Sequence, residues 1–143
     1  MDIIFLHTFF YNYTIAVPFA ALLFAILMKW GINAVKWKFT LHRMFGSGGM
    51  PSAHSTFVIA LSTAMGLKHG PESDQFLICL VFSIIIIYDA MNVRYQAGLH
   101  AKAINELTPH DSQELDEILG HTPIEAIAGG CVGFLSAVML LGI

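Results

Sequence analysis

Three histidines lie where apolar segments of the chain begin or end, in a sequence whose seven histidines equal its lysines and arginines in number. His54 follows a glycine-rich turn, His121 directly precedes an apolar run, and His100 comes shortly after another. An imidazole can act as a nucleophile, transfer a proton or bind a metal near neutral pH. The spacing of these histidines is generic for a metal site, so we predict no metal and no cofactor.

The turn before His54 is rich in glycine and covers residues 46–55. Glycine lets the backbone approach a ligand closely, and Pro51 suits the first position of a helix. The free N–H groups of Ser52, Ala53 and His54 would then point out of the helix N-terminus, where phosphate is stabilised. Taken alone, the segment is equally compatible with a phosphate site and with an ordinary capped helix start.

Charged residues near this turn strengthen the phosphate interpretation. Lys36 and Arg43 precede it, and Arg94 is predicted to lie on the same face of the protein. Arginine binds phosphate oxygens through a planar fork, whereas lysine acts as a point charge. We predict that these residues bind a phosphoryl group, although Lys36 and Arg43 also suit a role as topology determinants. Asp89 ends an apolar run, and an ionisable residue so close to hydrocarbon indicates a functional site.

The residues around His121 have a clear local explanation. Thr122, Pro123 and Glu125 follow the order of an N-cap, a first helical proline and the acid of a capping box. Capping therefore accounts for most of this motif and leaves His121 unexplained. We expect His121 on the same face of the protein as His54 and His100.

The composition predicts the elements that must position these residues. Of 143 residues, 56% are hydrophobic and 12% charged, with a mean hydropathy of +0.68, whereas a typical soluble domain has about 25% charged residues. Four apolar segments are candidates for membrane helices, which need roughly 20 residues. They cover about residues 3–28, 51–67, 76–93 and 123–143. We predict an all-α, multi-pass bundle of about four main helices that forms one membrane-embedded domain, residues 1–143.

Single residues refine the picture of this bundle. Asn12 and Pro18 predict an interfacial start and a kink in the first apolar segment. The second segment is short and rich in small residues, which predicts a helix packed inside the bundle. Gly129 and Gly133 form a G-x-x-x-G pair in the fourth segment, and such a pair lets another helix approach closely. A homo-oligomer formed through this pair is one predicted use of it.

The distribution of lysine and arginine predicts the orientation of the chain. These residues concentrate in the first and third connections between apolar segments, which the positive-inside rule assigns to the cytoplasm. We therefore predict a multi-pass protein of the cell membrane with its histidine site near the cytoplasmic face. The net charge of −3 and the pI near 6.1 provide no broad basic field, so we predict the lipid bilayer and no nucleic acid as partners.

Three segments taken together resemble the divergent type 2 phosphatidic acid phosphatase family, which is related to acid phosphatases and vanadium-dependent haloperoxidases. These segments are residues 43–55, 88–98 and 119–125, and the resemblance runs from about Arg43 to Gly133. Members of the family are small integral membrane proteins. The resemblance thus implies the same helical membrane fold that the composition predicts.

The parent superfamily carries the motifs K-x6-R-P, P-S-G-H and S-R-x5-H-x3-D, and this chain matches the first two in part. Lys36 and Arg43 keep the first spacing, with methionine in place of the proline. Ser52 and His54 keep the second motif, with Ala53 in place of glycine. By this resemblance, all of these positions line a phosphate site.

The third motif is matched by Arg94 and His100, but Ile104 stands in place of its aspartate. In the parent enzymes the histidine of this motif attacks phosphorus, and the histidine of the second motif protonates the leaving oxygen. The resemblance therefore implies His100 as nucleophile and His54 as general acid.

A nucleophilic histidine needs a partner that fixes its tautomer, and here Asp89 and Asn105 are the candidates. His121 is an alternative nucleophile or an added phosphate ligand. The resemblance implies an acid phosphatase-like hydrolase that acts on a lipid phosphomonoester or pyrophosphate in the membrane. The alternative is a non-catalytic membrane protein that binds or carries a lipid phosphate.

Overall fold

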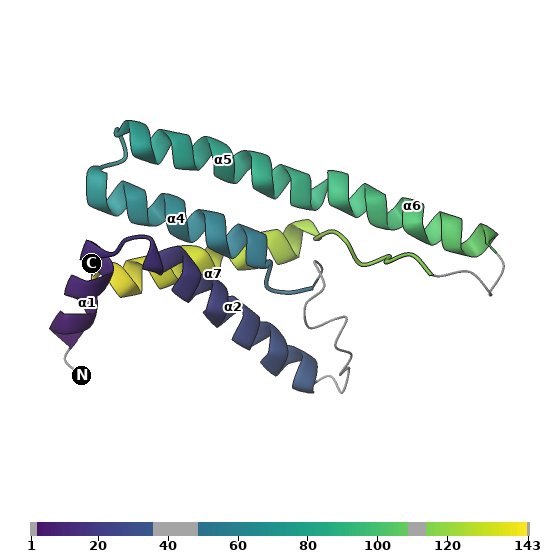
Figure 1. Ribbon diagram of the computed structural model, residues 1–143, viewed down its shortest axis with the longest axis horizontal. Helices are drawn as coiled ribbons and strands as arrows, with labels where there is room; N and C mark the ends of the chain where they lie inside the picture. Colours follow the sequence, from purple (N-terminus) through teal and green to yellow (C-terminus); the bar gives the residue numbers. More distant parts are fainter. Residues whose placement is uncertain (1–2, 36–48, 109–113, 143) are drawn as a thin grey trace.

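The computed structural model of the chain describes residues 3–35, 49–108 and 114–142. Within these ranges every regular element is a helix, and no strand occurs. The helices form an elongated bundle (Figure 1) and are α1 (Ile3–Asn12), α2 (Ala16–Val35), α4 (Ala53–His69), α5 (Asp74–Met91), α6 (Val93–Leu107) and α7 (Pro123–Leu141). The all-α class predicted from the sequence is confirmed.

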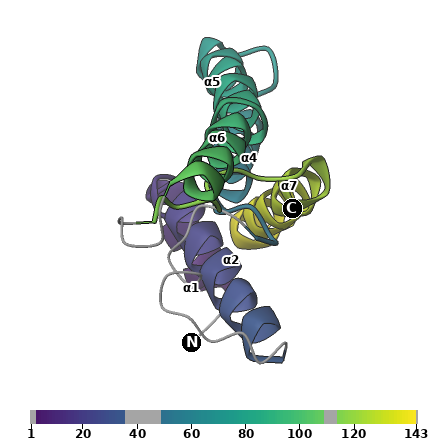
Figure 2. The ribbon, with the colours of Figure 1, turned by 90° about the vertical axis from the view of Figure 1, so that its right-hand side faces the viewer.

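Helix α4 lies at the centre of the bundle. The end-on view in Figure 2 shows it between α5, α7 and α2, and it contacts all three. Its buried residues all have small side chains: Ser55, Thr56, Val58, Ala60, Ser62 and Ala64. Small side chains let neighbouring backbones approach closely, so a helix of only 17 residues can be packed on several sides.

The closest of these contacts is between α4 and α7. A Cβ atom added to Gly129 would lie 2.3 Å from the Ser52 carbonyl oxygen, and one added to Gly133 would lie 2.4 Å from the Thr56 carbonyl oxygen. The Thr56 hydroxyl also donates a hydrogen bond of 2.9 Å to the Gly129 carbonyl oxygen. The G-x-x-x-G pair therefore serves a contact within the chain. A homo-oligomer formed through these two glycines would have to displace α4.

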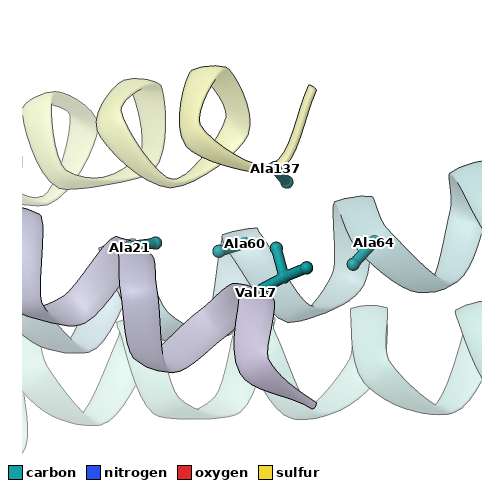
Figure 3. Packing of buried hydrophobic residues seen from close by; sticks show 5 residues of the cluster. All are labelled: Val17, Ala21, Ala60, Ala64 and Ala137. Carbon is teal, nitrogen blue, oxygen red and sulfur yellow. The ribbon is translucent and has the colours of Figure 1, made fainter. Parts of the chain in front are cut away.

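The apolar core lies where α2 begins and α7 ends, and its fully buried residues are small. Val17 and Ala21 of α2, Ala60 and Ala64 of α4, and Ala137 of α7 are fully buried against one another, as Figure 3 shows. Close helix packing without large side chains is typical of helices that associate in a membrane.

A polar contact joins α4 to α5. The hydroxyl oxygens of Ser62 and Ser83 lie 2.6 Å apart and are buried. Each hydroxyl also approaches the Val58 carbonyl oxygen, at 3.0 Å and 3.1 Å. Hydroxyl groups of this kind bond across helices where no water competes, so they fix the position of α5 beside α4.

The observed helix ends differ from the predicted segments in three places. The first apolar segment breaks after Asn12 and continues as α2 from Ala16, so the predicted kink is an interruption between two helices. Pro51 is not the first residue of α4, because Ser52 is the N-cap and the helix begins at Ala53. The third segment leads through a single residue into α6, which Figure 1 shows continuing the direction of α5.

Among the described residues, three helical stretches are long and apolar enough to cross a membrane. They are Ala16–Ala34, Asp74–Leu107 and Pro123–Leu141, and α4 is not among them. Large apolar side chains on α2, α5 and α7 are exposed, including Phe24, Phe82 and Phe134. In a bilayer such side chains face lipid.

Candidate functional site

The candidate site lies where α4 and α7 begin and α5 ends, which is one end of the α4 to α7 contact in Figure 1. His54 is the second residue of α4, and His121 directly precedes the N-cap of α7. Their ring centroids lie 5.9 Å apart, with an angle of 66° between the ring planes. The structure thus brings together two of the three histidines that the sequence singled out.

His121 is held by the segment that leads into α7. Its backbone N–H donates to the Ala90 carbonyl oxygen at 3.0 Å. The preceding Gly120 packs against the backbone of Tyr95, because an added Cβ would lie 2.4 Å from the Tyr95 nitrogen. Thr122 and Glu125 form the predicted capping box. The ends of α5, α6 and α7 therefore all position His121.

Glu125 has a second role that the capping motif did not reveal. Its Oε2 atom accepts from the Thr122 N–H at 3.0 Å and lies 3.3 Å from His121 Nδ1. A carboxylate at this distance accepts the Nδ1 proton, which assigns the lone pair of the neutral ring to Nε2. His121 is only 2% exposed, so Glu125 fixes a buried imidazole in one tautomer.

Two ring nitrogens at this site are buried without a hydrogen-bond partner among the described residues. They are Nδ1 of His54 and Nε2 of His121. Buried polar atoms in proteins nearly always have a partner, and each exception needs an explanation. A ligand between the two rings would supply the missing interactions.

Ser52 and the start of α4 were predicted to bind phosphate through backbone N–H groups. Ser52 is fully buried, its N–H donates to the Glu125 carbonyl oxygen at 3.1 Å, and its hydroxyl accepts from Ser55 N. These partners give Ser52 a structural role in joining α4 to α7. The N–H groups of Ala53 and His54 belong to the first turn of α4 and have no acceptor within the helix.

Asp89 and Arg94 lie close to His54 and to each other. Arg94 Nε and Asp89 Oδ2 form an ion pair at 2.7 Å, and both side chains are partly exposed. The two charges act on the His54 pKa in opposite directions, since Arg94 lowers it and Asp89 raises it. Asp89 is therefore the counterion of Arg94, and the guanidinium still has other N–H donors.

His100 lies apart from this cluster. It is exposed in the middle of α6, and no hydrogen bond joins it to Asp89 or Asn105 in the described part of the chain. Asn105 instead bonds the 114–117 segment, through contacts with Leu115 and Glu117. The structure thus provides His100 with neither of the orienting partners that the sequence suggested.

Lys36 and Arg43 lie outside the described residues, but the structure adds a cation that the sequence interpretation missed. Lys29 of α2 is 6% exposed. A Cβ added to Gly49 would lie 3.2 Å from Lys29 Cε and 3.9 Å from its Nζ. Lys29 therefore extends to the turn that precedes α4. The sequence predicts that the first apolar segment ends at about residue 28, which leaves Lys29 just outside the predicted helix.

Burial lowers the pKa of both imidazoles at the site. For His121, desolvation is the main cause, and the hydrogen bond and charge of Glu125 oppose it. For His54, desolvation is again the main cause, and the charge of Arg94 adds to it. The positive charge of Lys29 lowers both values further. Both rings are consequently favoured in the neutral state at neutral pH.

One cavity adjoins His54, and a second lies beside Glu125. One of about 340 Å³ is lined by apolar side chains of α2, α4 and α5 and reaches His54, and its walls are Phe19, Leu22, Ala53, Phe57, Val58 and Ile86. The other, of about 260 Å³, lies between α6 and the start of α7 and reaches Glu125. In the described residues, no group of three His, Cys, Asp or Glu side chains is placed to hold a metal ion.

The described residues form an all-helical bundle with three candidate spans, in which the buried His121 lies beside the half-buried His54. These features define a small membrane protein with a polar site among its helices. The chain belongs to the Divergent PAP2 family, whose model matches residues 10–136. It is similar to YuiD of Bacillus subtilis (strain 168), an uncharacterized membrane protein, with 34% identity over 148 residues. The match covers 90% of this chain and 94% of YuiD. No solved structure matches the chain. The predicted family and membrane character are confirmed.

Proposed function

We propose that this protein hydrolyses a lipid phosphomonoester or pyrophosphate, with His121 as the nucleophile and His54 as the general acid. The observation that carries the proposal is a pair of buried nitrogens, His54 Nδ1 and His121 Nε2, which have no hydrogen-bond partner among the described residues and belong to rings 5.9 Å apart. A phosphoryl group between them would meet a lone pair on one ring and a proton on the other. Glu125 at 3.3 Å from Nδ1 makes His121 the better nucleophile of the pair, because its lone pair is directed to Nε2.

The reaction proceeds in two balanced steps. In the first, a bond forms between His121 Nε2 and phosphorus and the bond from phosphorus to the lipid oxygen breaks. His54, which takes up a proton from water when the phosphate dianion binds beside it, gives that proton to the lipid oxygen. In the second, water attacks phosphorus, its proton passes to His54, and the bond from phosphorus to Nε2 breaks. A positioned proton donor of this kind contributes roughly 10²- to 10⁴-fold to the rate.

The surroundings of the two rings suit the charge of a phosphoryl group. The first-turn N–H groups of Ala53 and His54 favour an anion at the start of α4. Arg94 brings a guanidinium whose Nε is already fixed by Asp89 at 2.7 Å. Preorganised donors of this type stabilise the transition state of phosphoryl transfer more than covalent chemistry does.

The choice of a lipid rests on the cavity beside His54. Its volume of about 340 Å³ falls within the range of small-molecule sites, and its walls of Phe, Leu, Val and Ile suit a hydrocarbon chain. It lies between α2 and α5, each of which belongs to a candidate membrane span. A phosphorylated lipid would place its chain in this cavity and its headgroup between the rings. We propose the cytoplasmic face of the cell membrane for this site, from the distribution of lysine and arginine.

Phosphate release tests the proposal. The full chain, purified in detergent, is assayed with phosphatidate and with an isoprenyl phosphate, and wild type is compared with His121→Asn, His54→Ala and His100→Ala. We expect the first two substitutions to lower the rate by at least about 100-fold. His100→Ala is the matched control and should keep the rate within about threefold of wild type, because His100 is exposed on α6.

The same assay separates the alternatives. If His100→Ala abolishes release and His121→Asn does not, the nucleophile is His100, as the third motif of the parent superfamily implies. If wild type binds a lipid phosphate but releases no phosphate from any substrate, the protein is a lipid-phosphate binder or carrier. Either result would overturn the assignment of His121 as nucleophile.

A further inference from the structure

Lys29 is buried inside a helix that is apolar enough to cross the membrane. It lies in the Ala16–Ala34 stretch of α2, and it is the one Lys, Arg, Asp or Glu side chain that is buried in the described part of the chain. A charged residue at such a position is costly, and in membrane proteins it usually faces the bundle interior and marks a functional site.

The side chain of Lys29 extends toward the histidine pair. Its Cε lies 3.2 Å from the position of a Cβ added to Gly49, and Gly49 precedes α4 by four residues. Its charge acts on His54, His121 and Glu125. Helix α2 therefore supplies a cation to a site whose other residues come from α4, α5, α6 and the start of α7.

We infer that Lys29 is an anion-binding residue of this site, which donates from its ammonium group to the oxygens of a phosphoryl group held between His54 and His121. The inference rests on the proposed function only in taking the ligand to be a phosphoryl group. It stands on the burial of Lys29, on its position beside Gly49, and on Nε2 of the 98% buried His121, which has no hydrogen-bond partner in the described part of the chain. The ligand chemistry is that of a phosphomonoester dianion or of free phosphate.

Equilibrium binding tests this inference without any need for turnover. The full chain in detergent is titrated with inorganic phosphate and, separately, with dodecyl phosphate, and wild type is compared with Lys29→Met and Lys29→Arg. Loss of a hydrogen bond between charged groups weakens binding roughly 10- to 100-fold. We expect Lys29→Met to raise the half-saturating concentration of both probes by that factor, and Lys29→Arg to restore most of the affinity.

Lys68→Met is the matched control for loss of a lysine. Lys68 lies about 21 Å along α4 from His54 and binds the Tyr11 carbonyl oxygen and the Thr14 hydroxyl at 2.8 Å. Its substitution should leave the half-saturating concentration of both probes unchanged. Equal weakening by Lys68→Met and Lys29→Met would overturn the inference.

A second variant pair covers the case in which Lys29→Met does not fold. Gly49 and Gly70 have nearly the same positive φ, 92° and 91°, so alanine strains the backbone equally at both. The added methyl group meets Lys29 only at Gly49, because nothing lies within 4 Å at Gly70. We expect Gly49→Ala to weaken phosphate binding at least threefold and Gly70→Ala to leave it unchanged.

The outcomes for Lys29 and for the hydrolase proposal are distinguishable. Wild-type affinity of Lys29→Met for inorganic phosphate would overturn the inference, even if His121 and His54 prove essential for phosphate release. Weakened binding by Lys29→Met would support it, even if wild type releases no phosphate from any substrate. If Lys29→Met weakens the binding of dodecyl phosphate but not of inorganic phosphate, Lys29 lies beside the hydrocarbon chain of the ligand and not beside its phosphoryl group. That result would also overturn the inference.

Discussion

Substitution of Gly133 by alanine should destabilise the protein by separating α4 from α7. The added Cβ would lie 2.4 Å from the Thr56 carbonyl oxygen and 3.0 Å from Ala60 N. Ordinary contact begins at 3.4 Å, so the helices must move apart by about 1 Å. The obstructing atoms belong to the backbone and cannot rotate away, as the end of a side chain would.

The magnitude follows from three terms, of which two destabilise the protein and one stabilises it. Overpacking of a well-packed interior costs about 1–3 kcal/mol, occasionally more, and a backbone obstacle favours the upper end of that range. Alanine recovers up to about 1 kcal/mol through its higher helix propensity. A movement of 1 Å also lengthens the 2.9 Å hydrogen bond from Thr56 to Gly129, which is worth about 1 kcal/mol. We expect a net loss of about 2–3 kcal/mol.

Gly130→Ala is the matched control, because Gly130 lies in the same helix three residues away. Its added Cβ would lie 3.8 Å from Ile59 Cγ1, an ordinary contact, so this variant gains helix propensity without overpacking. Thermal unfolding in detergent should show Gly133→Ala melting several degrees below wild type and Gly130→Ala at or above it. A Gly133→Ala protein as stable as Gly130→Ala would refute the close α4 to α7 contact.

Other predictions concern the site and its supports. Burial lowers the pKa of His121 in the folded protein. As the pH falls below about 6.5, this histidine is therefore protonated in the unfolded chain before it is protonated in the folded protein. Stability should therefore decrease from pH 7.5 to 5.5 by at most about 1.4 kcal/mol per pH unit for this group. A plot of melting temperature against pH should be flatter for His121→Asn. Ser83→Ala removes the 2.6 Å contact with Ser62 and should cost about 0.5–1.5 kcal/mol in the same unfolding measurement; no change would mean that this contact does not stabilise the bundle. Glu125→Gln should slow phosphate release at least about tenfold and leave the phosphate affinity unchanged. Thr122→Ala removes only the cap and should not slow release. Equal rates of release for the two variants would mean that Glu125 has no role in the reaction.

Local patterns in the sequence predicted the local structure well. Apolar runs identified the helices except α6, which lies in the predicted third connection. The order Thr122, Pro123, Glu125 identified the start of α7 correctly. Asn12 and Pro18 indicated a disturbance that proved to be the break between α1 and α2. These features depend on neighbours within one turn of a helix, so a single sequence is sufficient to see them.

Features that depend on distant parts of the chain were not predictable in the same way. The G-x-x-x-G pair indicates that some helix approaches, but not that it is α4 of the same chain. The burial of Lys29 depends on how far α2 continues past the apolar run and on the contact between Lys29 and Gly49, which is distant in the sequence. Helical spacing also gave no reason to pair His121 with Glu125, because His121 lies before the N-cap, outside the helix.

The contact between Glu125 and His121 bears on the aspartate missing from the third motif. In the parent superfamily that aspartate orients the histidine of the same motif, whereas here Ile104 stands in its place and is 49% exposed on α6. A carboxylate could orient His100 only from outside α6, yet Asp89 pairs with Arg94. Glu125 already lies 3.3 Å from a buried imidazole. The carboxylate and histidine pair that the chemistry requires is therefore available at the start of α7, which is why we propose His121 as the nucleophile.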